Sequence, residues 1–213
     1  MVPGIVSVNV GRTGTEQWRG RVVKTAIRKY PVDGPVLADG VTLTGDDQAD
    51  RRIHGGPDKA VYAYAVEDYE WWEQQLDRAL PPGTFGENLT TRHLDVTNSA
   101  IGDRWHVGGA VFEVSQPREP CFKLAMRMGD GGFRKKFDAA RRPGAYLRII
   151  EPGRVEAGDS ITIRSAAGPA IRISDLVVDN LTPELMRRIV ADERVAYGWR
   201  RSAARFLEGL ELA

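Results

Sequence analysis

Short stretches of β-branched and aromatic residues recur along the first three-quarters of the chain. They are bounded by Gly, Pro or Asp, which is typical of strands that are separated by turns. Gly108 and Gly109 lie between two such stretches and predict a β-hairpin, because both turn positions can take a positive φ. The predicted strands include GIVSVNV (4–10), AVYAYAV (60–66), AVFEVSQ (110–116), AYLRII (145–150) and DSITIR (159–164).

Two segments with helical spacing interrupt the strands. The first covers residues 66–80, and Pro81 and Pro82 are expected to end it. The second covers residues 133–140, where Phe133 and Phe137 share a face. The apolar residues on one face of the first helix are Val66, Tyr69, Trp72, Leu76 and Leu80.

From about Ile171 the pattern changes to three short helices. Ser174, Thr182 and Gly198 each mark a helix edge, and Thr182 is an N-cap with Pro183 at the first helical position. We therefore predict a mixed α+β fold, mainly β, over residues 1–168. A small three-helix module is expected over residues 169–213.

Composition and charge exclude several classes of protein. Among 213 residues, 42% are hydrophobic and the net charge is only +1, so no overall field attracts nucleic acid or a membrane. Residues 171–213 carry seven basic and seven acidic side chains, which favours packing or docking over reading DNA. With no signal peptide, no apolar run of membrane-spanning length and a single cysteine, the expected location is the cytoplasm.

An acidic cluster lies in the segment GDDQAD (45–50). The spacing of Asp46, Asp47 and Asp50 matches carboxylates that hold magnesium diphosphate in prenyl-transfer enzymes, but those carboxylates share a helix face. Here Gly45 precedes them and strand signals surround them. We therefore expect a solvated acidic loop, in which Asp50 pairs with Arg51 or Arg52.

The next segment, HGGPDK (54–59), has the composition of an anion site. Gly55 and Gly56 allow backbone amides to point together, and His54 and Lys59 flank them with donors. An oxyanion or a phosphate would suit this arrangement. A plain tight turn explains the glycines equally well, and the spacing is not that of a nucleotide-binding phosphate loop.

A glycine-bracketed loop, PGTFGENLTT (82–91), carries Glu87 and Asn88. Both side chains have polar groups that could orient a ligand. The alternative is a loop in which Asn88 hydrogen-bonds its own backbone.

Cys121 is the single cysteine of the chain, in the segment SQPREPCFKLA (115–125). Prolines precede it and a helix-like run follows, so it is expected at a helix N-terminus. That position lowers a thiol pKa only modestly, and nearby Arg118 or Lys123 could add to the effect. An inert buried cysteine and a reactive one therefore remain equally open.

Taken together, the segments from about Val22 to Arg164 resemble the MOSC domain, named for the C-terminal domain of molybdenum-cofactor sulfurases, in its stand-alone, YiiM-type branch. The resemblance rests on the 45–73 segment, GTFGENL, IGDRW, VSQPREPCFKL and GAYLRI, which occur in that order. It implies a distorted β-barrel with surrounding helices, followed by the three-helix module. It also implies a molybdenum–pyranopterin cofactor in a basic cleft.

The resemblance assigns site residues by motif. The metal-binding cysteine corresponds to Cys121. Gln116, Arg118 and Lys123, which lie close to it in sequence, join the candidates for cofactor binding. The remaining motif positions are Thr25, Ile27 and Lys29 (T-x-I-x-K), His54, Gly55, Gly56 and Lys59 (HGG..K), and Gly86, Glu87 and Asn88 (GEN).

The implied activity is reduction of N-hydroxylated compounds such as hydroxylaminopurine-type bases, hydroxylamines or amidoximes. Glu87 or His54 would deliver a proton, and a separate flavin or iron–sulfur reductase would supply electrons. In one alternative the domain only carries the cofactor or a persulfide on Cys121. In another, Cys121 is the metal-free nucleophile of a hydrolase or transferase.

Overall fold

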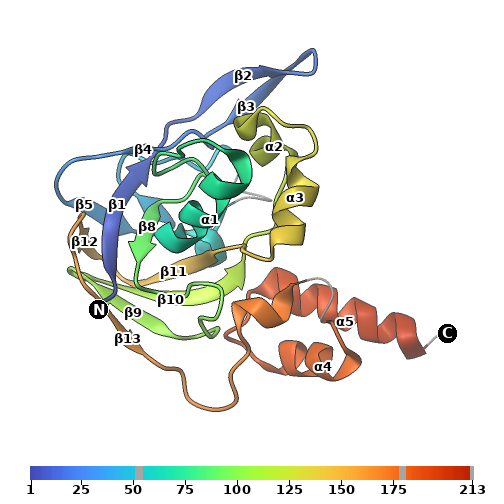
Figure 1. Cartoon of the computed structure of the whole chain (residues 1–213). Coiled ribbons are helices and arrows are strands. Elements are labelled where there is room, and N and C mark those ends of the chain that lie inside the picture. Colours follow the sequence, from blue (N-terminus) through green and yellow to red (C-terminus); the bar gives the residue numbers. More distant parts are fainter. Residues whose placement is uncertain (51–54, 178–180, 212–213) are drawn as a thin grey trace.

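An eight-stranded mixed sheet forms the centre of the protein (Figure 1). The computed structural model describes residues 1–50, 55–177 and 181–211. Neighbouring strands pair antiparallel, except for β7 and β8, which pair parallel. In the order of pairing, the strands are β13 (Ile161–Arg164), β9 (Arg104–Val107), β10 (Ala110–Pro117), β11 (Ala145–Glu151), β7 (Val61–Ala65), β8 (Leu89–Arg92), β1 (Gly4–Val10) and β4 (Tyr30–Pro31).

The sheet curves so that β1 approaches β13, but it does not close into a barrel. One isolated antiparallel bridge joins Gly4 to Ser160. Beside it, the Ile5 amide donates to the Asp159 carbonyl at 2.8 Å. The mixed, mainly β fold is confirmed, whereas the expected barrel is an open sheet, because β1 and β13 are joined only by this bridge and the few backbone hydrogen bonds beside it.

The position of strand β7 in the sheet explains why the segment AVYAYAV does not alternate between apolar and polar residues. Val61 and Ala63 belong to one hydrophobic cluster, while Tyr62 and Tyr64 belong to another. Since successive side chains of a strand point to opposite faces, β7 is buried on both faces and separates two cores. The first core lies among the strands, and the second is rich in aromatic residues.

Three helices cover the aromatic core: α1 (Val66–Leu76), α2 (Phe122–Met128) and α3 (Phe133–Ala140). The predicted helix at 133–140 is confirmed. The first helix ends earlier than predicted, at Leu76. There Asp77 takes a left-handed conformation (φ 48°), and its amide bonds the Glu73 carbonyl, so the helix is already capped before the prolines.

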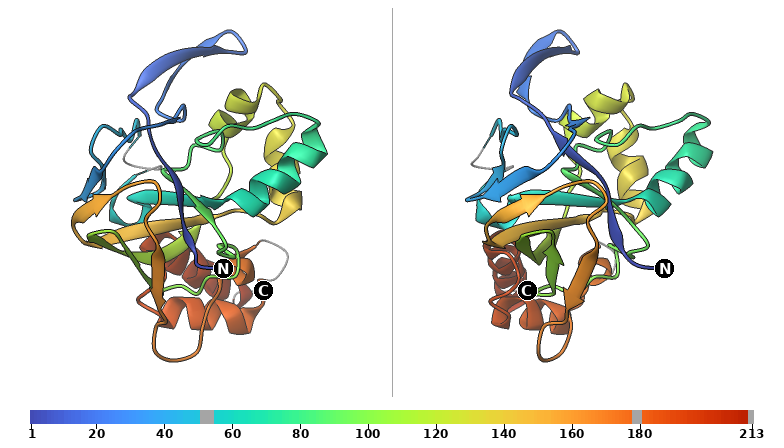
Figure 2. Two further views of the ribbon diagram at one scale, coloured as in Figure 1. Left: turned by 60° about the vertical axis from the view of Figure 1, so that its left-hand side comes forward. Right: turned by 90° about the vertical axis from the view of Figure 1, so that its left-hand side faces the viewer.

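Smaller elements surround the sheet. A hairpin of β2 (Gly14–Trp18) and β3 (Arg21–Thr25) projects from the body of the protein, as Figures 1 and 2 show. A second small sheet contains β12 (Gly153–Val155), β5 (Val36–Asp39) and β6 (Thr42–Leu43). The short 3-10 helix η1 (Pro57–Lys59) leads into β7.

The C-terminal region contains one 3-10 turn, η2 (Ile173–Leu176), and two helices, α4 (Pro183–Ala191) and α5 (Tyr197–Glu211). As predicted, Thr182 caps α4, and its side chain accepts from the Leu185 amide at 3.2 Å. Buried residues of this region join the same hydrophobic cluster as the strands. The division at residues 168/169 stays a prediction. Among the described helices, none is both long and apolar enough to cross a membrane.

Candidate functional site

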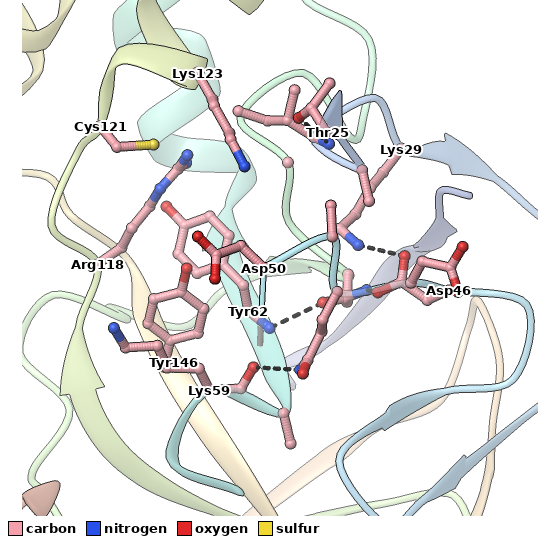
Figure 3. Close-up of a pocket in the computed structure, with 18 residues that line it drawn as sticks. Thr25, Lys29, Asp46, Asp50, Lys59, Tyr62, Arg118, Cys121, Lys123 and Tyr146 are labelled. Atoms are coloured by element: carbon pink, nitrogen blue, oxygen red, sulfur yellow. Dashed lines mark hydrogen bonds and ion pairs between the residues drawn. The ribbon is translucent and has the colours of Figure 1, made fainter. Parts of the chain in front are cut away.

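A pocket beside Cys121 gathers side chains from segments far apart in the sequence (Figure 3). The residues that line it are Thr25, Ala26, Ile27, Lys29, Asp46, Asp47, Gln48, Ala49, Asp50, Lys59, Ala60, Tyr62, Gly86, Asn88, Arg118, Cys121, Lys123 and Tyr146. Nine of the positions that the sequence singled out meet here: Thr25, Ile27, Lys29, Lys59, Gly86, Asn88, Arg118, Cys121 and Lys123.

Cys121 occupies the junction between β10 and α2. It is the N-cap of α2, with an extended backbone (φ −119°, ψ 173°), which confirms the predicted position at a helix start. The thiol is free and partly buried. In Figure 3 the sulfur lies beside the Arg118 side chain, and Lys123 extends into the pocket nearby.

Arg118 forms the wall next to Cys121 and is itself buried. Its guanidinium donates to the Phe85 carbonyl and lies 5.0 Å from the centroid of the Tyr62 ring. Arg118 therefore ties the loop that carries Gly86 to the strand that carries Tyr62. The cation remains available to the pocket because guanidinium keeps its charge in proteins.

Two tyrosines form the floor of the pocket. The Tyr62 hydroxyl donates to the Pro143 carbonyl at 2.8 Å, and the ring centroids of Tyr62 and Tyr146 are 5.2 Å apart. Burial raises the pKa of both phenols, so each keeps its proton at neutral pH. Lys59 Nζ lies 5.9 Å from the centroid of the Tyr146 ring. Neither tyrosine was among the site residues predicted from the sequence. For Tyr62 there was a signal, because the alternation of Tyr and Ala in β7 indicates that one face of this strand carries large side chains.

Asp46 and Lys29 form a buried ion pair on the opposite wall. Asp46 also accepts from the Gly11 amide at 2.8 Å and from Asn88 Nδ2 at 2.9 Å. Burial lowers the pKa of Lys29, and the nearby Asp46 carboxylate opposes this shift. The expectation of a solvated acidic loop is wrong for Asp46, because partners from three distant segments bury its carboxylate. Arg51 and Arg52, the expected partners of Asp50, lie outside the described residues.

Glu87 lies behind the pocket and does not line it. It is fully buried, and its Oε1 accepts from the Tyr69 hydroxyl at 2.6 Å, the Gly83 amide at 2.6 Å and the Thr90 hydroxyl at 2.8 Å. Burial raises its pKa, which these hydrogen bonds partly counter. In this position Glu87 stabilises the 83–88 loop.

Asn88, like Glu87, has a structural role. Its Oδ1 accepts from the Tyr62 amide at 3.1 Å, and its Nδ2 donates to the Asn9 carbonyl at 3.2 Å. The loop thereby holds β1 and β7 in position around the pocket.

The remaining candidates lie around the same region. The Gly56 amide donates to Gln48 Oε1 at 3.1 Å, and the Gln48 Nε2 donates to the Lys59 carbonyl at 3.1 Å. Gln48 therefore fixes the GGPDK turn from inside the pocket. Gly55 and Gly56 do not line the pocket, and neither does Gln116, which is buried in β10. His54 lies outside the described residues.

The side chains that line the pocket determine which kind of ligand it could bind. Four lining residues are basic, namely Lys29, Lys59, Arg118 and Lys123. Three are acidic, namely Asp46, Asp47 and Asp50, and Asp46 is paired with Lys29. Within the described ranges, no cluster of three or more His, Cys, Asp or Glu side chains could hold a metal ion. A metal at Cys121 would therefore need to bring most of its ligands with it, as part of an anionic cofactor.

Comparison with known proteins decides the family. Residues 50–162 match the MOSC domain. YflK of Bacillus subtilis (strain 168), named an uncharacterized protein, is 36% identical over 204 residues, which are 93% of this chain and 91% of that protein. The chain belongs to the MOSC domain family. This MOSC protein also resembles the crystal structure of YiiM from Geobacillus stearothermophilus, with a TM-score of 0.79, 28% identity and coverage of 96% of this chain and 99% of that one.

A third relative has a name that mentions an activity. A protein of Gibberella moniliformis (strain M3125 / FGSC 7600) named "Reductase" is 34% identical over 170 residues. The match covers 76% of this MOSC protein but only 29% of the fungal one.

Proposed function

We propose that this MOSC protein is a molybdenum-cofactor-dependent reductase of N-hydroxylated compounds: hydroxylaminopurine-type bases, hydroxylamines or amidoximes. The observation that carries the proposal is the single thiol in a pocket with several basic side chains and no further cluster of metal ligands among the described residues. The family and the fungal relative named "Reductase" support the same class of reaction.

The lining residues fit this cofactor chemically. A soft thiolate suits a metal that also has dithiolene sulfurs, so Cys121 would be the protein ligand. Lys59, Arg118 and Lys123 would balance the charge of the pterin phosphate. When bound, the cofactor supplies the two-electron chemistry that removes the oxygen from nitrogen.

The chain's own residues would bind and orient the substrate. Tyr62 and Tyr146 provide aromatic surface, and their raised pKa values keep their hydroxyls protonated. The proton for the leaving amine or amidine was assigned to Glu87 or His54 on the sequence. The burial of Glu87 behind the loop favours a group that lines the pocket instead.

Two other functions use the same thiol. A metal-free cysteine nucleophile needs a base, and none of the described residues that line the pocket is a histidine. A carrier of the cofactor, or of a persulfide on Cys121, would use the same pocket without turnover. The relative named "Reductase" favours turnover over the carrier.

A reduction assay tests the proposal. The protein is produced in a host that makes the cofactor and is supplied with reduced methyl viologen and a hydroxylaminopurine. We expect release of the aminopurine, and a loss of rate of about 100-fold or more in Cys121→Ala, since even second-shell partners of a metal contribute about 10- to 100-fold. Bound molybdenum without reduction of any N-hydroxylated substrate would favour the carrier.

A further inference from the structure

A basic groove lies next to the pocket, between the β2–β3 hairpin and the start of α2. Two of its residues, Asp50 and Lys123, also line the pocket beside Cys121, so the groove adjoins the pocket. The residues that line the groove are Trp18, Arg19, Arg21, Val22, Val23, Lys24, Asp50, Phe122 and Lys123.

Four of the nine residues that line this groove are basic (Arg19, Arg21, Lys24 and Lys123) and one, Asp50, is acidic, although the whole chain is nearly neutral. Residues 14–25 and 121–140 contain eight of the 30 Lys and Arg residues but only three of the 29 Asp and Glu residues. The rest of the chain therefore has 22 basic and 26 acidic side chains. Such an asymmetry attracts an acidic partner to one end of the molecule.

Exposed apolar side chains accompany this charge. Val22 is 65% exposed and Phe122 is 51% exposed, on the two sides of the groove. Large apolar side chains surrounded by charged ones are typical of surfaces that another protein covers. The basic side chains Arg21 and Lys24, which line the same groove, make no ion pair within the part of the chain that the structure describes.

The hairpin itself is positioned to meet a partner. A two-stranded hairpin is marginally stable alone, and this one projects from the body with most of its residues exposed (Figure 2). It is braced on one side, because a Cβ on Gly131 would lie 2.0 Å from Arg19 Nη2. The braced hairpin and α2 therefore form two walls of one surface.

We infer that this basic groove is the docking surface for the protein that donates electrons, an acidic flavin or iron–sulfur protein. The inference rests on the proposed reductase function, in which each turnover consumes two electrons and two protons and releases water with the amine. A single cysteine can hold neither an iron–sulfur cluster nor a redox dithiol, so the electrons must come from another molecule. A donor in the groove would lie directly beside the pocket of Cys121.

The C-terminal helices are a poorer surface for this donor. Residues 171–213 have equal numbers of basic and acidic side chains. In Figures 1 and 2 these helices lie at the end of the molecule opposite to the hairpin. A single-stranded nucleic acid would also suit basic and aromatic side chains, but it would supply no electrons, so its binding is an outcome for the test to distinguish.

The test compares protein donors with a small-molecule donor. Turnover of the cofactor-loaded enzyme is measured with reduced methyl viologen, with an acidic flavodoxin and with an acidic [2Fe–2S] ferredoxin, each reduced through its NADPH-dependent reductase. For the double variant Arg21→Glu/Lys24→Glu, we expect KM for the protein donor to rise about tenfold or more at low salt, because opposite charges steer association. The rate with methyl viologen should not change. Added salt should reduce the difference in KM for the protein donor between the variant and the wild type.

The matched control is Arg187→Glu/Arg201→Glu, which reverses two exposed charges on α4 and α5. The inference is overturned if neither acidic protein supports turnover, if the control pair raises KM equally, or if the groove variant loses activity equally with methyl viologen. It is also overturned if the groove variant loses affinity only for a labelled single-stranded oligonucleotide. Absence of turnover with methyl viologen in the wild type would instead reject the reductase function itself.

Discussion

Buried carboxylates at Asp46 and Glu87 both stabilise the part of the pocket wall that contains Lys29. Asp46 is paired with Lys29 and held by the Gly11 amide, whereas Glu87 is held by Tyr69 and the Gly83 amide. Both residues position backbone and basic side chains without lying at the Cys121 thiol. A buried carboxylate of this kind costs free energy when ionised unless its partners compensate.

Glu87 should make the stability of the protein depend on pH. Burial raises its pKa above the ordinary value of 4.5, so the folded state keeps the proton to a higher pH than the unfolded state does. The free energy of unfolding should therefore fall as pH rises from about 4.5 through the folded-state pKa. Glu87→Gln removes this titration, and urea unfolding at pH 5 and pH 8 should show the variant gaining stability relative to wild type at the higher pH.

The matched control is Glu70→Gln, an exposed residue of α1. It should show no such relative gain. If wild type and Glu87→Gln changed in parallel between the two pH values, the raised pKa of Glu87 would be rejected.

At this scale the sequence allowed the position of Cys121 to be predicted but not the environment of the carboxylates. Pro120 before Cys121 and the apolar spacing after it are local signals, so the N-cap position follows from neighbours in sequence. The burial of Asp46 depends on Lys29, Gly11 and Asn88, which are brought together only by the fold. A run of Asp residues in a glycine-flanked loop looks the same whether or not such partners exist.

The elements around the pocket depend on close backbone contacts at the 83–88 loop. Gly83 has a φ of 83°, and a Cβ there would lie 2.4 Å from the Lys29 carbonyl oxygen. Gly86 has a φ of 77°, and its Cβ would lie 3.0 Å from the Ile27 side chain. The loop therefore packs directly on the segment that carries Lys29, with no room for a side chain between them.

Gly83→Ala should destabilise the protein by roughly 3 kcal/mol or more, since a left-handed backbone and a steric clash combine. Gly20→Ala in the hairpin turn is the matched control, with a φ of 75° and no atom within 4 Å of its Cβ. That variant should lose only about 1–2 kcal/mol. The measurement is the free energy of unfolding in urea; equal losses in the two variants would show that the close approach at Gly83 has no energetic role.

The two hairpins show which elements the sequence specified. The turn at Gly108–Gly109 was predicted because apolar strands flank a pair of glycines, and β9 and β10 confirm it. The turn at Arg19–Gly20 was not predicted, although φ is positive at both positions (49° and 75°). Arginine is not a usual residue for that conformation, and the flanking strands GTEQW and RVVKT do not alternate between apolar and polar residues.

On the scale of the whole molecule, the C-terminal helices and the sheet share one hydrophobic core. Met186, Ile189 and Val195 belong to the same cluster as the strand residues Trp105 and Phe112. The spacing of apolar residues indicated that these segments were helical, but it did not identify the residues against which they pack. A shared core predicts that the helices unfold together with the sheet.

Ile189→Ala should therefore lower the stability of the entire protein by about 2–5 kcal/mol, because Ile189 is completely buried in the shared cluster. Calorimetry should show one transition that shifts to lower temperature. Its neighbour Val190, which is 38% exposed, supplies the control Val190→Ala, with a small expected loss. Two separate transitions, with only one affected by Ile189→Ala, would instead support an independent module.

Charge is the second property that only the whole molecule shows. A net charge of +1 gave no reason to expect an electrostatic surface, because the count averages over the chain. The fold brings the basic residues of the β2–β3 hairpin next to those of α2, at the same end as the pocket of Cys121. The composition alone therefore hid the asymmetry on which the docking inference depends.

The central claim is that Cys121 holds a molybdenum cofactor in this pocket, and metal analysis tests it most directly. Protein made in a cofactor-competent host is purified and its molybdenum is measured per chain. We predict near-stoichiometric molybdenum in the wild type and in the exposed-site control Arg201→Ala, and a clear loss in Cys121→Ala. Wild-type protein without molybdenum, or an unchanged content in Cys121→Ala, would contradict the account.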